Sequence, residues 1–164
     1  DLRAAVVIVQ HVDERVASGM AGWLNVHSNL PVRLARDGDL LMPGEVLLAG
    51  TSDHLVLTEG RRVQYVREPK DEIYRPSINV LFHSLCAVWK GPVIGVLLTG
   101  MGSDGARGLK AMRDSGYHTI TQDSETSAVF GMPRAAAAIS AAVDILPLQQ
   151  IAPTLVNLVA GNRV

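Results

Sequence analysis

The sequence contains only one cysteine, Cys86, so no disulfide bond can form within the chain. Aromatic residues make up 4% of the chain, and the formal net charge is −1. Proteins that bind nucleic acid usually present a basic surface or a platform of aromatic rings, and this composition favours neither. No apolar run is long enough to span a membrane, and no signal peptide is visible. We therefore expect a cytoplasmic protein with no nucleic-acid partner and no direct membrane insertion.

The overall composition is typical of a globular domain. Hydrophobic residues account for 48% and charged residues for 19% of the 164 residues, which is enough to build one sizeable core. No internal repeat, long linker or low-complexity tract divides the chain. We expect one domain over residues 1–164.

Strand and helix patterns alternate at both ends of the chain. The run Ala4–Gln10 is rich in β-branched residues, as expected for a parallel strand buried on both faces, and His11 follows it. Asp13 can cap a helix that extends to about residue 25. The apolar face predicted for this helix consists of Val16, Met20, Trp23 and Leu24.

The middle of the chain contains a hairpin signal. Strand patterns at residues 54–58 and 62–66 flank the turn residues Glu59-Gly60-Arg61. Further strands are predicted at residues 32–35, 46–49, 93–98, 118–122 and 143–146. Further helices are predicted at residues 75–90, 106–113, 134–142 and 147–159, the last interrupted near Pro153. This order predicts an α/β fold: a doubly wound, mostly parallel sheet flanked by helices, with a small antiparallel hairpin.

The glycine-rich run Thr99-Gly100-Met101-Gly102-Ser103-Asp104-Gly105 lies between a predicted strand and a predicted helix. Such turns lie at the carboxyl edge of a parallel sheet, where α/β proteins place their sites. The run has the spacing G-x-G-x-x-G, with Asp123 roughly 20 residues further on, as in dinucleotide-binding loops. One interpretation is therefore a nucleotide-binding module that uses Gly100–Gly105. The carboxylate of Asp104 argues against it, because it would repel a pyrophosphate held by the same loop.

The other interpretation of the loop is catalytic. Asp104 precedes a helix whose positive N-terminal end favours an ionised carboxylate. Such a carboxylate can orient an imidazole in a nucleophile–histidine–acid triad. His11 is a suitable partner, because it ends another predicted parallel strand. No group of His, Cys and carboxylate residues has metal-ligand spacing, so we expect no metal and no other cofactor.

Four motifs occur in a fixed order along the chain. They are Val7-Ile8-Val9-Gln10-His11, Arg75-Pro76-Ser77-Ile78-Asn79-Val80-Leu81-Phe82, Leu97–Gly105 and Gly131-Met132-Pro133-Arg134-Ala135-Ala136. Together they closely resemble the catalytic domain of the chemotaxis receptor methylesterases, which are protein-glutamate methylesterases. The resemblance extends from about Ala4 to Leu158.

The resemblance implies a role for each matching residue. His11 corresponds to the general base, and Asp104 to the acid that orients it. The backbone N–H of Met101 corresponds to an oxyanion-hole donor. The residues expected to line the site beside it are Gly100, Gly102 and Met132. The implied reaction is hydrolysis of glutamate methyl esters on the helical cytoplasmic domain of chemoreceptors, within a two-component adaptation system.

One element of the family pattern has no match in this chain. The family's nucleophilic serine lies in a glycine-rich turn upstream of the strand that ends at His11. Ser18, the first serine here, falls on a predicted helix, and Ser103 is too close to Asp104 to be an independent triad member. We therefore expect an N-terminally trimmed catalytic domain without its first strand-turn-helix segment. The intact protein would supply the serine and an N-terminal phosphoreceiver domain, and the fragment alone would be inactive. A non-catalytic interaction domain that lost its serine in evolution remains the alternative.

Overall fold

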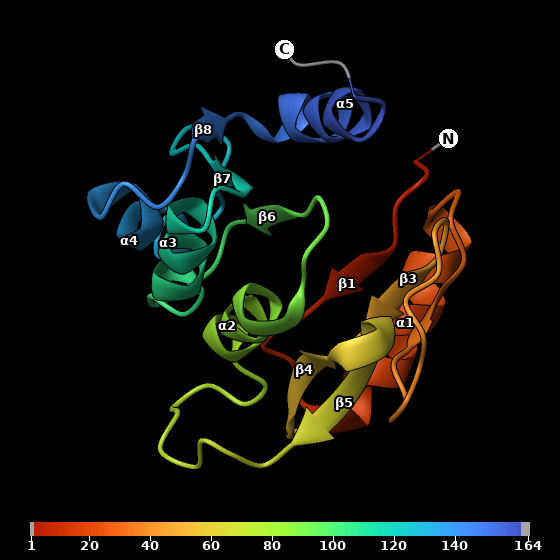
Figure 1. Ribbon diagram of the computed structural model, residues 1–164. Helices are drawn as coiled ribbons and strands as arrows, with labels where there is room; N and C mark the ends of the chain where they lie inside the picture. The colour runs from red at the N-terminus through yellow and green to blue at the C-terminus, as the bar shows by residue number, and fades with distance from the viewer. Residues whose placement is uncertain (1, 162–164) are drawn as a thin grey trace. The chain divides into compact units, whose positions relative to one another are not determined.

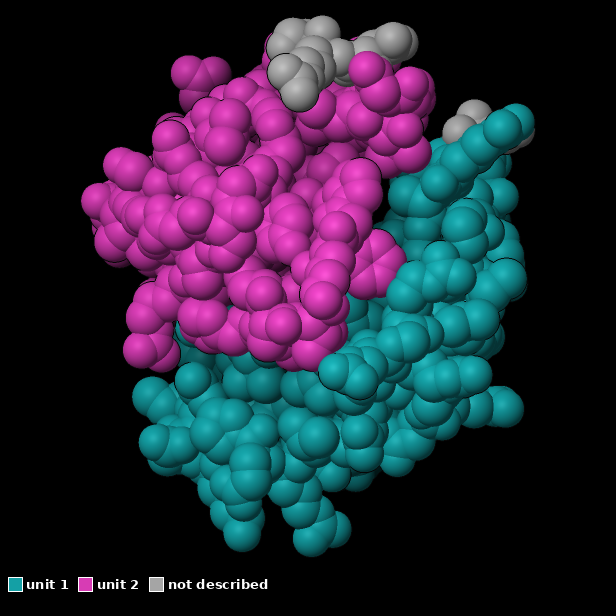
Figure 2. Space-filling view, viewed as in Figure 1, with its two compact units in different colours: residues 1–81 teal, residues 82–164 magenta. Residues whose placement is uncertain are grey.

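Helices and strands alternate along most of the chain (Figure 1). The structure is a computed structural model that describes residues 2–161. The chain divides into two units, residues 1–81 and residues 82–164, coloured separately in Figure 2. The division falls within helix α2 (Ile78–Val88). Each unit contains a three-stranded parallel sheet, and a two-stranded antiparallel sheet is also present. The predicted α/β class is therefore confirmed, although the strand pairing divides the parallel strands between two sheets.

The parallel sheet of unit 1 has the strand order β1-β3-β2. Its strands are β1 (Val6–Ile8), β2 (Val32–Leu34) and β3 (Val46–Leu48). β3 lies in the middle and is buried along its whole length, so its branched side chains form the centre of this unit's core. β1 is shorter than the predicted strand at residues 4–10. His11 therefore follows the strand after a short connection rather than ending it.

Helix α1 (Glu14–His27) begins as predicted, because the Asp13 side chain accepts a hydrogen bond of 2.9 Å from the Arg15 N–H. The prediction of its apolar face was half right. Met20 and Leu24 are half-buried on the face that also carries the buried Ala17 and Ala21. Val16 and Trp23, also predicted there, are 54% and 61% exposed.

The predicted hairpin is confirmed. β4 (His54–Thr58) pairs antiparallel with β5 (Arg62–Val66), and a short 3₁₀ turn, η1 (Glu59–Arg61), connects them. Gly60 has φ of 72°, a left-handed conformation that favours glycine. One face of the hairpin is buried, with Leu55, Leu57 and Val63 at its centre.

Unit 2 is built on the sheet β6 (Ile94–Leu97), β7 (His118–Gln122) and β8 (Asp144–Leu146), with β7 in the middle. Its helices are α3 (Ala106–Asp114), α4 (Met132–Ala138) and α5 (Leu148–Val159). In Figure 1, α3 and α4 lie beside each other on one side of this sheet, and α5 lies on the other. Ile120 of β7 and Leu109 and Met112 of α3 are fully buried between these layers. α4 is shorter than predicted, and α5 continues through Pro153 without the predicted interruption.

An ion-pair network connects β2 to the two turns that follow it. The Arg33 guanidinium donates to Glu45 over 2.6 Å and also to the Asp39 carboxylate. The Arg36 N–H donates to the same Asp39 carboxylate over 2.7 Å. Burial alone would raise the pKa of Asp39, but the hydrogen bonds from Arg33 and Arg36 favour its ionised form and lower that pKa.

A carboxyl group with a lowered folded-state pKa stabilises the fold above its unfolded-state pKa, and that stabilisation is lost as the pH falls through the folded-state pKa. We therefore expect Asp39→Asn to reduce the free energy of unfolding at pH 7 by about 0.5–1 kcal/mol. The difference from wild type should shrink below about pH 4. Urea titrations at a series of pH values would measure it. Asp71→Asn is the control, since Asp71 is exposed and makes no ion pair or hydrogen bond within residues 2–161. An equal loss in both variants at pH 7 would contradict the prediction.

Candidate active site

The glycine-rich loop follows β6 and leads directly into α3, as its sequence predicts. Gly102 and Gly105 have φ of 84° and 86°, which L-residues with side chains rarely adopt. These two glycines turn the chain sharply between the strand and the helix. The turn places the residues between them at the carboxyl end of β6.

A second segment, residues 129–132, closes over this loop through backbone hydrogen bonds. The Gly100 N–H donates to the Val129 carbonyl over 3.0 Å. The Gly100 carbonyl accepts from the Gly131 and Met132 N–H groups over 3.1 and 2.8 Å. The Thr99 hydroxyl accepts a hydrogen bond of 2.8 Å from the Val129 N–H. The position of the glycine loop is therefore fixed by a segment about thirty residues later in the chain, not by β6 alone.

Gln122 anchors the start of the loop from the neighbouring strand β7. Its side-chain oxygen accepts the Thr99 N–H over 2.9 Å, and its side-chain nitrogen donates to the Thr126 carbonyl over 2.8 Å. Gln122 is 1% exposed, so both groups need these partners. This role of Gln122 was not predicted. A polar residue at the end of a buried strand was the only available signal.

Asp123 forms a local turn. Its carboxylate accepts the Thr126 N–H and hydroxyl over 2.9 and 2.6 Å. The nucleotide-binding interpretation needs this carboxylate for a ribose, and the turn already uses it. This geometry weakens the dinucleotide alternative.

Asp104 is the buried acid of the loop. It is 2% exposed and directly precedes Gly105, the N-terminal capping residue of α3. A carboxylate at this position is stabilised in its ionised form by the helix dipole. No group of three or more potential metal ligands lies within residues 2–161.

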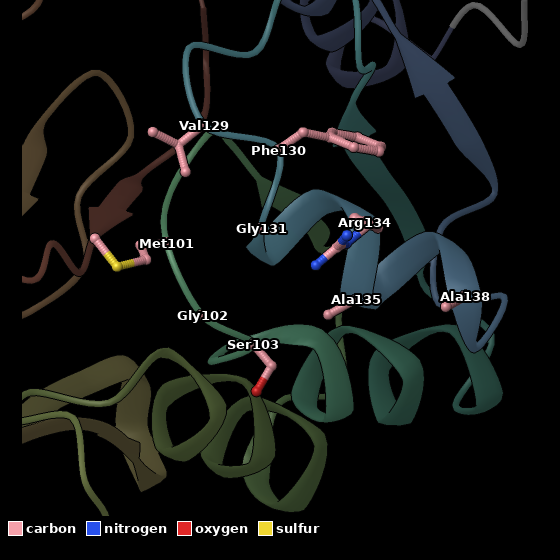
Figure 3. Close-up of a pocket in the computed structure, with 9 residues that line it drawn as sticks. All are labelled: Met101, Gly102, Ser103, Val129, Phe130, Gly131, Arg134, Ala135 and Ala138. Carbon is pink, nitrogen blue, oxygen red and sulfur yellow. The ribbon is translucent and has the colours of Figure 1, made fainter.

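A groove of about 730 Å³ lies beside the loop (Figure 3). Met101, Gly102 and Ser103 contribute one side of it. Met101 is 77% exposed, and its backbone N–H makes no hydrogen bond within the described part of the chain. Arg134 is the only charged residue of the lining. An unpaired backbone donor in an open groove is a suitable group for binding an oxyanion.

The remaining lining residues come from the segment that closes over the loop and from α4. They are Val129, Phe130, Gly131, Ala135 and Ala138. Gly100 and Met132 lie next to these residues in the chain but do not line this groove, and their predicted place in the site stays a prediction. Met132 is buried, and a Cβ built on Gly100 would lie 2.1 Å from the Met132 methyl group. These two residues therefore support the loop from beneath.

His11 belongs to unit 1, whereas the loop residues belong to unit 2. The imidazole of His11 is partly buried and stacks on the ring of Tyr74. The ring centroids are 4.5 Å apart, and the ring planes differ by 14°. His11 was predicted from its place after a strand, whereas no role was predicted for Tyr74. Nothing in the local sequence shows that a residue so distant in the chain contacts His11.

Two other histidines have clear structural partners. His54 is fully buried, and its Nδ1 accepts the Ser77 N–H over 3.0 Å. His118 and Asp144 begin the neighbouring strands β7 and β8 and lie 2.6 Å apart. Both strands begin at the sheet edge opposite to the glycine loop. Neither histidine is therefore a candidate base for chemistry at that loop.

The α/β fold therefore presents a buried acid and an unpaired backbone N–H on one glycine-rich loop. The family model of the CheB methylesterases matches residues 1–155. The chain belongs to the CheB methylesterase family, so the resemblance noted in its motifs is confirmed.

Curated relatives with high sequence identity carry the corresponding name. Protein-glutamate methylesterase/protein-glutamine glutaminase 4 of Burkholderia thailandensis is 60% identical over 163 residues, which are 99% of this chain and 48% of the relative. A similarly named protein of Pseudomonas savastanoi pv. phaseolicola is 59% identical over 94% of this chain and 46% of its own length. The chain thus spans about half the length of the curated relatives it matches.

A solved structure supports the fold. The crystal structure of the Thermotoga maritima CheB methylesterase catalytic domain superposes with a TM-score of 0.89 at 32% sequence identity. The match covers 96% of this chain and 85% of that one. Within residues 2–161, no helix is long and apolar enough to cross a membrane.

Gly131 provides a test of the loop closure. A Cβ at this position would lie 2.6 Å from the Gly100 carbonyl oxygen and 3.0 Å from the Gly102 nitrogen, and these backbone atoms cannot rotate away. We expect Gly131→Ala to displace the loop, to reduce the free energy of unfolding by about 1–3 kcal/mol and to lower any esterase activity. Urea denaturation and activity assays of the intact protein would measure both effects.

The control for this prediction is Gly22→Ala in α1. No heavy atom lies within 4 Å of a Cβ built on Gly22, and alanine favours a helix over glycine by up to about 1 kcal/mol. Gly22→Ala should therefore stabilise the protein. Wild-type stability and activity in Gly131→Ala would show that the closure is less tight than the structure indicates.

Proposed function

We propose that the intact protein hydrolyses methyl esters of glutamate side chains on the helical cytoplasmic domain of chemoreceptors, as part of an adaptation system controlled by two-component signalling. The observation that supports this most directly is the loop that combines the buried Asp104 with the unpaired N–H of Met101. Membership of the CheB methylesterase family and the names of the relatives support the same reaction. The reaction takes place in the cytoplasm, where this receptor domain lies.

In this proposal, His11 is the general base and Asp104 orients it. The base removes the proton from a serine hydroxyl as the serine oxygen attacks the ester carbonyl carbon. The negative charge that develops on the carbonyl oxygen is stabilised by the Met101 N–H, next to Gly102 in the groove. His11 then gives the proton to the leaving methoxide, and methanol departs. Water then attacks the acyl-enzyme while His11 removes its proton, and His11 returns the proton to the serine oxygen as it leaves. The product is a glutamate carboxylate.

We assign the nucleophilic serine to a segment of the intact protein outside residues 1–164. Ser18 lies on α1 of unit 1, and Ser103 is adjacent to Asp104, so neither has the independent position that a triad nucleophile needs. Residues 1–164 then form the larger part of the catalytic domain and are inactive without that segment. An N-terminal phosphoreceiver domain is the proposed regulator, because the family resemblance implies one.

Substitution of the proposed base and acid tests this function. We expect His11→Gln and Asp104→Asn each to lower kcat for methyl-ester hydrolysis by about a thousandfold or more, because each removes a group that acts in the transition state. Methanol release from methylated receptor fragments by the full-length protein would measure the rate. Circular dichroism would show that each variant is folded.

Matched controls are His27→Gln and Asp114→Asn. Both residues are exposed, His27 at the end of α1 and Asp114 at the end of α3. Both variants should retain wild-type kcat. Retention of wild-type kcat by a folded His11→Gln variant would exclude His11 as the base.

A further inference from the structure

The ring of Tyr74 covers one face of the His11 imidazole, and both residues lie within unit 1. With ring planes only 14° apart, the contact defines the plane of the imidazole. It occupies the ring face and leaves the ring edge, where both nitrogens lie, to other partners. We propose that Tyr74 is a positioning residue that holds the His11 imidazole in the orientation required of the general base. The inference rests on the function proposed above for His11.

Tyr74 is itself held by the residue that follows it. The Arg75 guanidinium donates to the carbonyl oxygens of Arg67 and Pro69 over 3.0 and 3.2 Å. It also lies 3.5 Å from the Asp53 carboxylate. Arg75 therefore links its own backbone to residues 67 and 69 and to Asp53, the residue before β4. A tyrosine on an unanchored loop could not fix the orientation of another ring, and this tyrosine lies on an anchored one.

The buried His54 provides a second anchor for the same segment. Its Nδ1 accepts the Ser77 N–H over 3.0 Å. Its Nε2 lies 3.0 Å from the Pro69 carbonyl oxygen and 3.2 Å from the Arg75 guanidinium. His54 thus binds the chain on both sides of Tyr74. These bonds restrict the backbone on both sides of Tyr74, and His54 and Ser77 are themselves fully buried.

The stack is suited to a histidine that changes charge during a reaction. An offset aromatic pair is stable while the imidazole is neutral, and the face of a tyrosine ring also attracts a cation. The contact can therefore persist when His11 accepts a proton. Because base orientation matters in the transition state rather than in substrate binding, loss of the stack should lower kcat and leave KM nearly unchanged.

Histidine NMR spectra of the full-length protein would detect the stack independently of catalysis. The ring current of Tyr74 shifts the carbon-bound ring protons of His11 upfield, and Tyr74→Leu should remove that shift. Tyr74→Phe should retain it, because the Tyr74 hydroxyl makes no hydrogen bond within the described residues. His27 is an internal control, since it stacks on Trp23 with centroids 4.4 Å apart. Its resonances should move in Trp23→Leu and stay unchanged in Tyr74→Leu.

Kinetics then test whether the stack serves catalysis. We expect Tyr74→Leu to lower kcat about three- to tenfold with little change in KM. Tyr74→Phe, which keeps the stacked ring, should have the wild-type kcat. Unchanged His11 resonances in Tyr74→Leu would show that the stack does not form. Moved resonances with wild-type kcat would show that it forms but does not position a base. A wild-type kcat in His11→Gln would instead contradict the proposed function, so the two failures are distinguishable.

Discussion

The backbones of residues 100–102 and residue 131 approach so closely that no side chain fits between them at Gly131. Hydrogen bonds at Gly100 maintain this approach, and Gln122 fixes the start of the loop from the next strand. The loop held by this closure carries the Met101 N–H, which has no hydrogen-bond partner within the described residues, and the buried Asp104, which lies just before α3. In the proposed mechanism these two groups are the oxyanion donor and the acid.

In each unit a buried polar side chain holds a segment of the proposed site. In unit 1, the buried His54, together with the half-buried Arg75, holds the segment that carries Tyr74. In unit 2, the buried Gln122, together with the exposed Thr99, holds the loop that carries Met101. An unpaired buried polar group costs about 1–3 kcal/mol, so His54 and Gln122 each favour the one arrangement that pairs them. Such restriction allows active-site groups on loops to keep a defined geometry.

Local patterns predicted most of the secondary structure and the parts of the site that are contiguous in sequence. Alternating strands and helices predicted the α/β class, and the strand-turn-helix pattern predicted the loop around Asp104. The roles of Gln122, Tyr74 and Gly131 were not predictable from local patterns, because each depends on a contact with residues far away in the chain. The apolar face of α1 was only partly predicted for a related reason. Hydrophobicity favoured Val16 and Trp23, but the buried positions are Ala17 and Ala21.

The central claim is that His11 and Asp104 act as one catalytic unit. A double-mutant cycle on kcat for methyl-ester hydrolysis, with His11→Gln, Asp104→Asn and the double variant in the full-length protein, tests it most directly. If Asp104 acts by orienting His11, the double variant should be about as slow as the slower single variant. Independent effects, with the two losses multiplying in the double variant, would contradict the claim.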